Sequence, residues 1–204
     1  MATTEDIIRD LLQIKAVQIK TEGYFKWTSG IQSPIYCDNR LTISHPNVRQ
    51  KITQAFIHHI NEQQLEVDCI AGCATAGIPH AAWLADALGL PMVYVRSKPK
   101  AHGKENQIEG EVKQGQKVIV VEDLISTGGS AIESAQALQK AGVEVLGVLA
   151  IFTYGLRKAE TAFREAGFQY AAITGFDSLI QVLETDGKIN QIDSKQLLAW
   201  RGQL

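Results

Sequence analysis

The chain has 204 residues and a formal net charge of -2, with 20 Lys and Arg against 22 Asp and Glu. A chain of this length can bury a substantial core, and a balanced charge without a basic run argues against non-specific nucleic-acid binding. The acidic start MATTEDII lacks a signal-peptide core, and the longest apolar run, 145–152, is too short to cross a bilayer, so we expect a cytoplasmic protein. Cys37, Cys69 and Cys73 have no metal-ligand spacing and are expected to be free thiols in packing roles.

The N-terminal part of the chain predicts two helices with an irregular segment between them. The first helix is capped by Thr3 or Thr4, and its apolar residues recur at helical spacing up to about Val17. The aromatic-rich segment YFKWTSGIQSPIYCDNR follows and includes a short strand at 35–37. A second helix begins near Pro46 and has an apolar stripe that is typical of core contact.

From residue 67 onward, apolar strands alternate with amphipathic helices. The expected strands are 67–72, 92–96, 118–121, 143–152 and 170–174, and the expected helices follow 77, 131 and 158, with a mostly helical tail from Ser178 that Asp177 or Ser178 caps. Short apolar runs without a polar break suit strands that are buried on both faces of a parallel sheet. We therefore predict an α/β fold with an open, mostly parallel sheet flanked by helices, in a single domain, 1–204.

Two loops at the expected carboxyl edge of the sheet are candidates for anion binding. The small-residue loop 73–77 fits either a pyrophosphate contact or a close-packed turn, since such loops are common in α/β folds. Arg96 ends the next strand, and the polar loop 97–110 after it carries Lys98, Lys100, His102 and Lys104. We expect no regular structure in 97–110. Alone, a charged loop is most often a solvated connection, but beside a phosphate site it fits a lid that closes and reopens.

The stretch VIVVEDLISTGGS, 118–130, joins an apolar strand to two acids and a small-residue turn. We expect Glu122 and Asp123 to end the strand at the carboxyl edge of the sheet and not in its interior, where unpaired charge is costly. The glycines of the turn permit positive φ and close approach to an anion, and the next helix would direct its positive end at that anion. Acids cannot serve the same phosphate, so they fit hydroxyls, a cation or a developing positive charge. A ribose phosphate combines these features.

The pattern of apolar strand, Glu-Asp, two apolar residues and Ser-Thr-Gly-Gly resembles the signature of the type I phosphoribosyltransferases. The stretch lacks the Gly-Lys-Ser/Thr ending of a nucleoside-triphosphate P-loop, and the chain has no Gly-x-Gly-x-x-Gly fingerprint after a strand. The aromatic-rich segment resembles the N-terminal part of the orotate phosphoribosyltransferases, where it helps to form a hood over the base. Arg96, Lys100 and His102 match in order the Arg, Lys and His of that family's flexible catalytic loop.

This resemblance implies that the protein joins orotate to the ribose of phosphoribosyl pyrophosphate and releases orotidine monophosphate and pyrophosphate. The implied substrate-binding residues are Arg96, Lys100, His102, Glu122, Asp123, Leu124, Ile125, Ser126, Thr127, Gly128, Gly129 and Ser130. Lys100, His102 and Asp123 are expected to be catalytic, and Ser126 is expected to lie next to orotate. A Mg2+ cofactor would be held mainly by the substrate's own oxygens, with no protein metal site.

The resemblance also implies a homodimer in which the lid, 97–110, acts on the neighbouring subunit's site. The hood is expected to comprise about 1–43 and part of the C-terminal tail. Several positions depart from the family pattern: Thr28 replaces a hood Lys, Tyr36-Cys37 replaces Phe-Phe, Ala76 replaces a loop Lys, and Arg157 lies a few residues later than the family's Arg.

Two alternatives to orotate chemistry stay open. One is a phosphoribosyltransferase for another base, such as xanthine. The other is a non-catalytic regulator that senses phosphoribosyl pyrophosphate. The absence of a basic face or an added DNA-binding segment disfavours the regulator, and a cationic lid makes sense only if pyrophosphate leaves.

Overall fold

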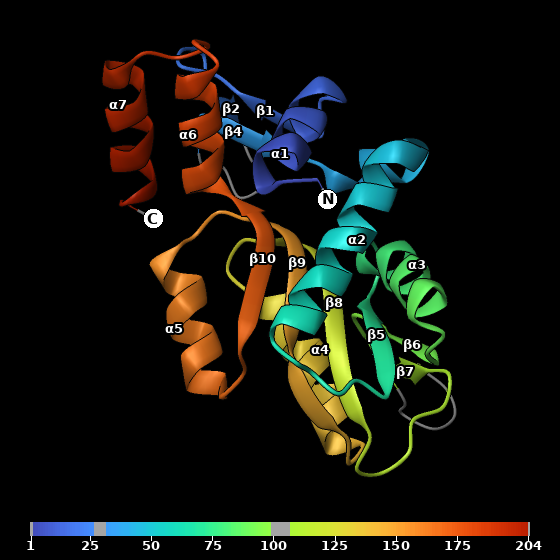
Figure 1. Ribbon diagram of the computed structural model, residues 1–204. Coiled ribbons are helices and arrows are strands. Elements are labelled where there is room, and N and C mark those ends of the chain that lie inside the picture. The colour runs from blue at the N-terminus through green and yellow to red at the C-terminus, as the bar shows by residue number, and fades with distance from the viewer. Residues whose placement is uncertain (1, 27–31, 99–106, 204) are drawn as a thin grey trace.

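A six-stranded sheet in the order β10-β9-β8-β5-β6-β7 forms the centre of the computed structural model, which describes residues 2–26, 32–98 and 107–203. Its strands are β5 (Cys69–Cys73), β6 (Met92–Val95), β7 (Ile108–Glu109), β8 (Lys117–Ile125), β9 (Glu144–Thr153) and β10 (Tyr170–Gly175). All neighbouring pairs are parallel except β6 and β7, which are antiparallel. The expected mostly parallel sheet is confirmed (Figure 1).

Helices cover both faces of this sheet, because its central strands are apolar on both sides. Ile119 and Val121 of β8 belong to the same cluster as buried residues of α2 (Pro46–Glu62) and α3 (Gly77–Leu88). Val118 and Val120, which alternate with them, belong to a second cluster with buried residues of α4 (Gly129–Lys140) and α5 (Arg157–Ala166). The uninterrupted apolar run of β8 thus serves two separate cores.

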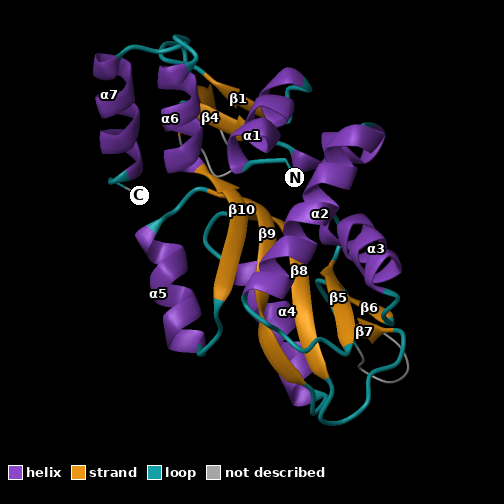
Figure 2. Cartoon of the chain, viewed as in Figure 1, coloured by secondary structure: helices purple, strands orange, loops and turns teal. Residues whose placement is uncertain are grey.

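The N-terminal segment and the C-terminal helices lie together at the carboxyl end of the sheet (Figure 2). They comprise α1 (Thr4–Gln13), β1 (Val17–Ile19), β2 (Phe25–Lys26), β3 (Gln32–Ser33), β4 (Ile35–Cys37), the 3-10 helix η1 (Asn39–Ser44), α6 (Phe176–Thr185) and α7 (Gln191–Arg201). We call this group the hood. Strands β1 and β4 form an antiparallel pair, and β2 and β3 form another.

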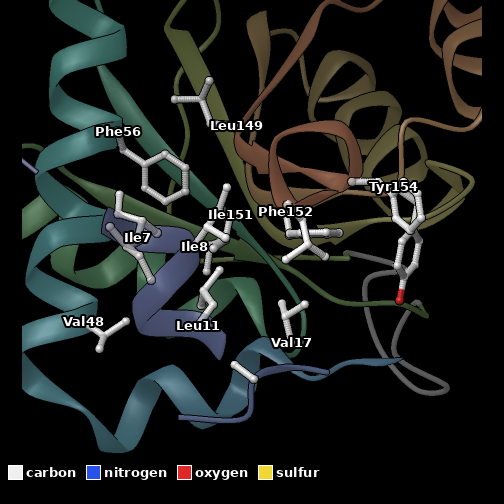
Figure 3. Packing of buried hydrophobic residues seen from close by; sticks show 14 of the residues in the cluster. Ile7, Ile8, Leu11, Val17, Val48, Phe56, Leu149, Ile151, Phe152 and Tyr154 are labelled. Atoms are coloured by element: carbon white, nitrogen blue, oxygen red, sulfur yellow. The ribbon is translucent and has the colours of Figure 1, made fainter. Parts of the chain in front are cut away.

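The hood is attached to the sheet through the larger of the two apolar clusters. Ile7, Ile8 and Leu11 on one side of α1 are each 1% exposed and pack in the same cluster as Phe56 of α2 and Ile151 of β9 (Figure 3). Burying apolar side chains of this size stabilises the fold by roughly 1.5–3 kcal/mol each. The hood and the sheet therefore share one continuous core.

Four expected boundaries were wrong, and each error lies at an element's end. The first helix ends at Gln13, so Val17 begins β1 instead. The loop 97–110 is not wholly irregular, because it contains strand β7, which pairs with the preceding strand β6. Strand β8 does not end at the acids but continues to Ile125. Helix α6 begins at Phe176 with Gly175 as its cap residue, while the Ser178 hydroxyl accepts the Gly175 N–H at 3.2 Å.

The predictions for the cysteines and for membrane spans can also be compared with the described residues. Cys37, Cys69 and Cys73 are all free thiols, as expected. Among the helices within 2–26, 32–98 and 107–203, none is long and apolar enough to span a bilayer.

Candidate active site

The carboxyl end of β8 carries the acids that the sequence singled out. The pairing of β8 with β5 ends at Val121, whereas its pairing with β9 continues through Glu122 to Ile125. Glu122 is only 6% exposed. The expectation that both acids avoid the interior is therefore wrong for Glu122, because β9 and α4 cover it. Asp123 is partly exposed.

Hydrogen bonds explain how the buried carboxyl group of Glu122 is tolerated. The backbone N–H of Asp123 donates to Glu122 Oε1 at 3.0 Å, and the Ser130 hydroxyl donates to Glu122 Oε2 at 3.0 Å. Burial, and then the negative charge of Asp123, raises the pKa of Glu122 to about 8. Burial also raises the pKa of Asp123. Neighbouring carboxyl groups do not both ionise readily, so the pair keeps one proton at neutral pH.

The turn from β8 into α4 leaves the start of that helix open to solvent. Thr127, Gly129 and Ser130 are exposed, and the helix begins at Gly129. The first N–H groups of a helix have no acceptor within the helix, and its N-terminus carries partial positive charge. This end of α4 therefore has the features of an anion-binding site.

Gly128 has the positive φ that the sequence indicated, and it also packs closely against α5. Its φ is +83°, as expected for a turn glycine. A Cβ atom at this position would lie 2.7 Å from Cε2 of Phe163 in α5. The backbone at Gly128 thus approaches α5 closely, and its approach to an anion stays a prediction. At Gly129, by contrast, a Cβ would meet no atom within 4 Å.

A pocket of about 400 Å³ lies in front of the acids. It is lined by Cys37, Asp38, Arg40, Ala74, Thr75, Ala76, Glu122, Asp123, Leu124 and Ser130. The loop 73–77, the hood and the end of β8 thus meet at one place. Gly77 allows the loop to pack closely, because a Cβ there would clash with the carbonyl oxygen of Val121. Binding of pyrophosphate by this loop stays a prediction.

Two pocket residues lie at positions where the chain departs from the family pattern. Ala76 and Cys37 line the pocket at the positions of the family's loop Lys and second hood Phe. Tyr36 is 39% exposed and lies 5.8 Å from the ring of Phe25. Cys37 and Ala76 therefore bring smaller side chains to the pocket than the family's Phe and Lys would.

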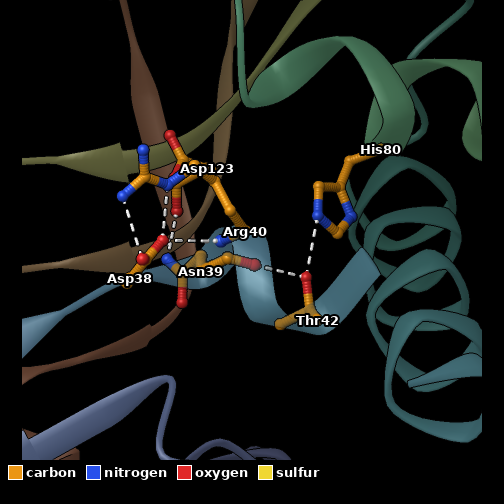
Figure 4. A network of polar contacts seen from close by, with 6 residues as sticks. All are labelled: Asp38, Asn39, Arg40, Thr42, His80 and Asp123. Carbon is orange, nitrogen blue, oxygen red and sulfur yellow. Dashed lines mark hydrogen bonds and ion pairs between the residues drawn. The ribbon is translucent and has the colours of Figure 1, made fainter. Parts of the chain in front are cut away.

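Sequence reasoning missed the start of η1, which faces the end of β8. Asp38 and Arg40 form an ion pair, in which Arg40 Nε lies 2.6 Å from Asp38 Oδ1. The side-chain amide of Asn39 donates to the backbone oxygen of Asp123 at 2.7 Å (Figure 4). The run Asp-Asn-Arg directly after the strand 35–37 was the available signal, since polar residues after a strand mark the edge at which α/β folds bind ligands.

The remaining predicted residues lie outside this pocket or outside the described residues. Arg96 follows β6 and pairs with Glu109, with 3.5 Å between Nη1 and Oε1. Arg157 is exposed at the first position of α5. Lys100, His102 and Thr28 lie outside the described residues. Ser126 to Gly129 form the turn that joins the pocket to α4.

Comparisons with known proteins agree with this site. The family model described as "Phosphoribosyl transferase domain" matches residues 42–169. A protein of Oceanobacillus iheyensis named orotate phosphoribosyltransferase is 58% identical over 98% of this chain and 99% of its own length. A Bacillus subtilis protein of the same name is 56% identical over 96% of this chain and 90% of its own.

A solved structure of a protein with the same name has a similar fold. The orotate phosphoribosyltransferase from Aeropyrum pernix superposes with a TM-score of 0.77 at 27% identity, over 90% of this chain and 99% of that one. The residues matched by the family model, 42–169, include the acid pair and the helix start that follows it. The signature at 118–130, the pocket and these relatives together show that the chain belongs to the orotate phosphoribosyltransferase family.

Proposed function

We propose that the protein transfers the phosphoribosyl group of phosphoribosyl pyrophosphate to orotate, a step in the formation of UMP. The observation that supports this most is the acid pair at the end of β8, followed directly by an exposed helix start. Its relatives from Oceanobacillus iheyensis and Bacillus subtilis carry the name of this activity over nearly the whole chain.

In the proposed reaction, a ring nitrogen of orotate forms a bond to the anomeric carbon as the bond to pyrophosphate oxygen breaks. The ribose ring carries positive charge in such a transition state. Asp123 would stabilise that charge, and the acid pair would bind the ribose hydroxyls. The N–H groups from Ser126 to Ser130, in the turn and at the start of α4, would bind the ribose phosphate.

The leaving pyrophosphate needs positive charge that the described pocket supplies only in part. Arg40 lines the pocket but is already paired with Asp38. We assign this charge to Arg96 and to Lys100 and His102 of the following loop 97–110, which would act as a lid.

The acid pair also fits a role near Mg2+, since carboxylate oxygens are ligands that this ion accepts. Within 2–26, 32–98 and 107–203 no cluster of three or more metal-ligating side chains occurs. Glu122 and Asp123 would therefore contribute at most part of the coordination, and substrate oxygens would supply the rest. When bound, the ion would neutralise charge on pyrophosphate.

One assay tests the proposed activity. Purified protein is mixed with orotate, phosphoribosyl pyrophosphate and Mg2+, and the loss of orotate absorbance is followed. We expect orotate to disappear and pyrophosphate to accumulate in equal amounts. If orotate persists while xanthine is consumed instead, the enzyme serves another base; if neither is consumed, the protein is not a transferase of this kind.

A further inference from the structure

A chain of hydrogen bonds runs from the buried side chain of His80 in α3 to the backbone of Asp123. His80 Nε2 lies 3.1 Å from the Thr42 hydroxyl, and that hydroxyl donates to the backbone oxygen of Asn39 at 2.5 Å. The side-chain amide of Asn39 then donates to the backbone oxygen of Asp123 at 2.7 Å. Figure 4 shows the four residues in this order.

The direction of each hydrogen bond follows from the number of available protons. The Thr42 hydroxyl has a single proton, and a carbonyl oxygen cannot donate, so this proton lies on the bond to Asn39. His80 Nε2 must therefore carry a proton and donate it to Thr42. Burial lowers the pKa of His80 to about 4, so the ring is neutral at physiological pH. A neutral ring with a proton on Nε2 has none on Nδ1.

The side chains of Asn39, Thr42 and His80 are shielded from water, so they cannot exchange these partners for solvent. Asn39 and Thr42 are 0% exposed and His80 is 1% exposed. The ring of His80 is held further by an edge contact with Trp83, with 5.2 Å between centroids. A buried polar network with fixed partners specifies one geometry more tightly than exposed contacts do.

Asn39 contacts β8 at a position beyond the end of its pairing with strand β5. The pairing of β8 with β5 ends at Val121, so the sheet no longer holds that edge of the strand at Asp123. The N–H of Asp123 donates to Glu122 Oε1 at 3.0 Å, and its C=O accepts from Asn39. Both polar groups of the Asp123 backbone are thus held by side chains.

We propose that Asn39, oriented by Thr42 and His80, is a positioning residue that fixes the backbone of Asp123 and thereby aims its carboxyl group at the ribose. The aim of the carboxyl group rests on the proposed function, but the fixation of the backbone does not. Asn39, Thr42 and His80 act only through Asp123 and need not touch substrate. Charge placed for the transition state must be held accurately, because small displacements weaken electrostatic stabilisation.

The first test is Asn39→Leu, which keeps the number and branching of the side-chain heavy atoms and removes the donor to Asp123. We expect kcat to fall by about tenfold to a hundredfold, while KM for either substrate changes by less than about threefold. The split follows because a displaced Asp123 weakens transition-state stabilisation more than ground-state binding.

A matched pair of Thr→Val variants separates positioning from general damage to the core. Thr42→Val breaks the chain, whereas Thr53→Val removes a buried hydroxyl that donates to Arg49 O at 2.9 Å within α2. Both variants lose one buried hydroxyl and keep a similar shape. We expect kcat to fall by about threefold to tenfold in Thr42→Val and to stay unchanged in Thr53→Val.

Variants of His80 test the direction of the bonds. The amide nitrogen of Gln can replace Nε2 as a donor, so His80→Gln should retain most of kcat. His80→Leu has no donor and should resemble Thr42→Val. Equal kcat values for the Gln and Leu variants would contradict the assigned role of His80.

Amide hydrogen exchange tests the backbone fixation without any turnover. Asn39→Leu should raise the exchange rate at 122–125 above that of the wild type, and Thr53→Val should not. Unchanged exchange in folded Asn39→Leu would overturn the proposal. If Asn39→Leu fails to fold, a kcat of Thr42→Val equal to that of Thr53→Val would overturn it. If wild-type protein consumes no orotate, the proposed function fails, and the exchange data alone then decide whether Asn39 holds Asp123.

Discussion

Glu122 and Asp123 are neighbours in sequence, but their surroundings give them different roles. Glu122 is 6% exposed and accepts two hydrogen bonds, so it is built into the site. Asp123 is partly exposed and lines the pocket. We therefore expect Asp123→Asn to keep the fold and lose about a hundred- to a thousandfold in kcat, because the negative charge at the ribose is removed. Steady-state kinetics and a thermal melt check this, and a variant with normal kcat would refute the role.

The raised pKa of Glu122 makes stability depend on pH. The ordinary value of 4.5 applies in the unfolded chain and about 8 in the folded protein, so the native state holds an extra proton between these values. Stability from this group is thus present below about 4.5 and is lost as pH rises towards 8. Glu122→Gln removes this loss. Relative to the wild type, the free energy of unfolding of the variant should therefore rise by at most about 1.4 kcal/mol per pH unit.

Denaturant unfolding of both proteins at pH 5 and pH 8.5 measures this difference. The gain of Glu122→Gln over the wild type should be larger at pH 8.5. A gain that is the same at both values would mean that the folded protein keeps Glu122 ionised throughout.

Gly128 and Gly129 are adjacent but should respond differently to Ala. Gly128 has φ +83° and a Cβ there would lie 2.7 Å from Phe163 Cε2, so Gly128→Ala adds backbone strain and a clash. We expect it to lower the Tm by about 5 °C or more and to raise KM for phosphoribosyl pyrophosphate as the turn shifts. Gly129→Ala adds a Cβ in open space within a helix and should leave the Tm unchanged or higher. Equal melts for the two variants would contradict this account.

At this scale, the sequence identified the acid pair and the turn but not their supports. The motif is contiguous, so its chemistry can be read from local order. Asn39 and Asp123 are 84 positions apart, and only the fold brings them together. The burial of Glu122 and the contact of Gly128 with α5 also depend on elements that are distant in sequence. No local pattern encodes these contacts.

At the scale of elements, helices and strands were predicted where hydrophobic periodicity is long and unmixed. The apolar runs that became β8 and β9, and the stripe that became α2, are of this kind. Errors occurred where pairing decides the boundary. β7 exists because its two residues pair with β6, and β8 continues past its acids because β9 still pairs with it. Pairing of this sort is a property of the sheet and not of the segment.

The C-terminal helix α7 supports the hairpin of β2 and β3 through a hydrogen bond from Trp200. The indole N–H of Trp200 donates to the backbone oxygen of Gln32 in β3 at 3.1 Å, and its ring lies 6.1 Å from that of Phe176. Trp200→Phe removes the donor and keeps an aromatic ring. If the hairpin of β2 and β3 belongs to the base site, KM for orotate should rise by about threefold to tenfold, since one hydrogen bond contributes about 1 kcal/mol.

KM for phosphoribosyl pyrophosphate should stay within error in Trp200→Phe, because that substrate binds at the end of β8. Gln196→Ala, an exposed change on the same helix, serves as the control. If both KM values rise, or neither does, the hairpin has no specific role in orotate binding.

At the scale of the whole molecule, we expect each active site to combine residues of two subunits. The pocket beside Glu122 and Asp123 holds one described cation, Arg40, and Asp38 already neutralises it. We assign the missing positive charge to the loop 97–110, whose sequence resembles a family loop that is expected to act across a dimer. Closed two-fold symmetry would place each loop over the partner's site.

Mixing two inactive variants tests this arrangement. Lys100→Ala and Asp123→Asn are unfolded together in equal amounts and refolded, so that about half of the dimers contain one chain of each kind. If Lys100 acts on the partner's site, each mixed dimer has one intact site and one with both defects. About a quarter of wild-type activity should then return. If Lys100 serves its own chain, every site keeps one defect and no activity returns. Native mass spectrometry confirms that mixed dimers have formed, so an inactive mixture would place the loop over its own chain while leaving the phosphoribosyl chemistry unaffected.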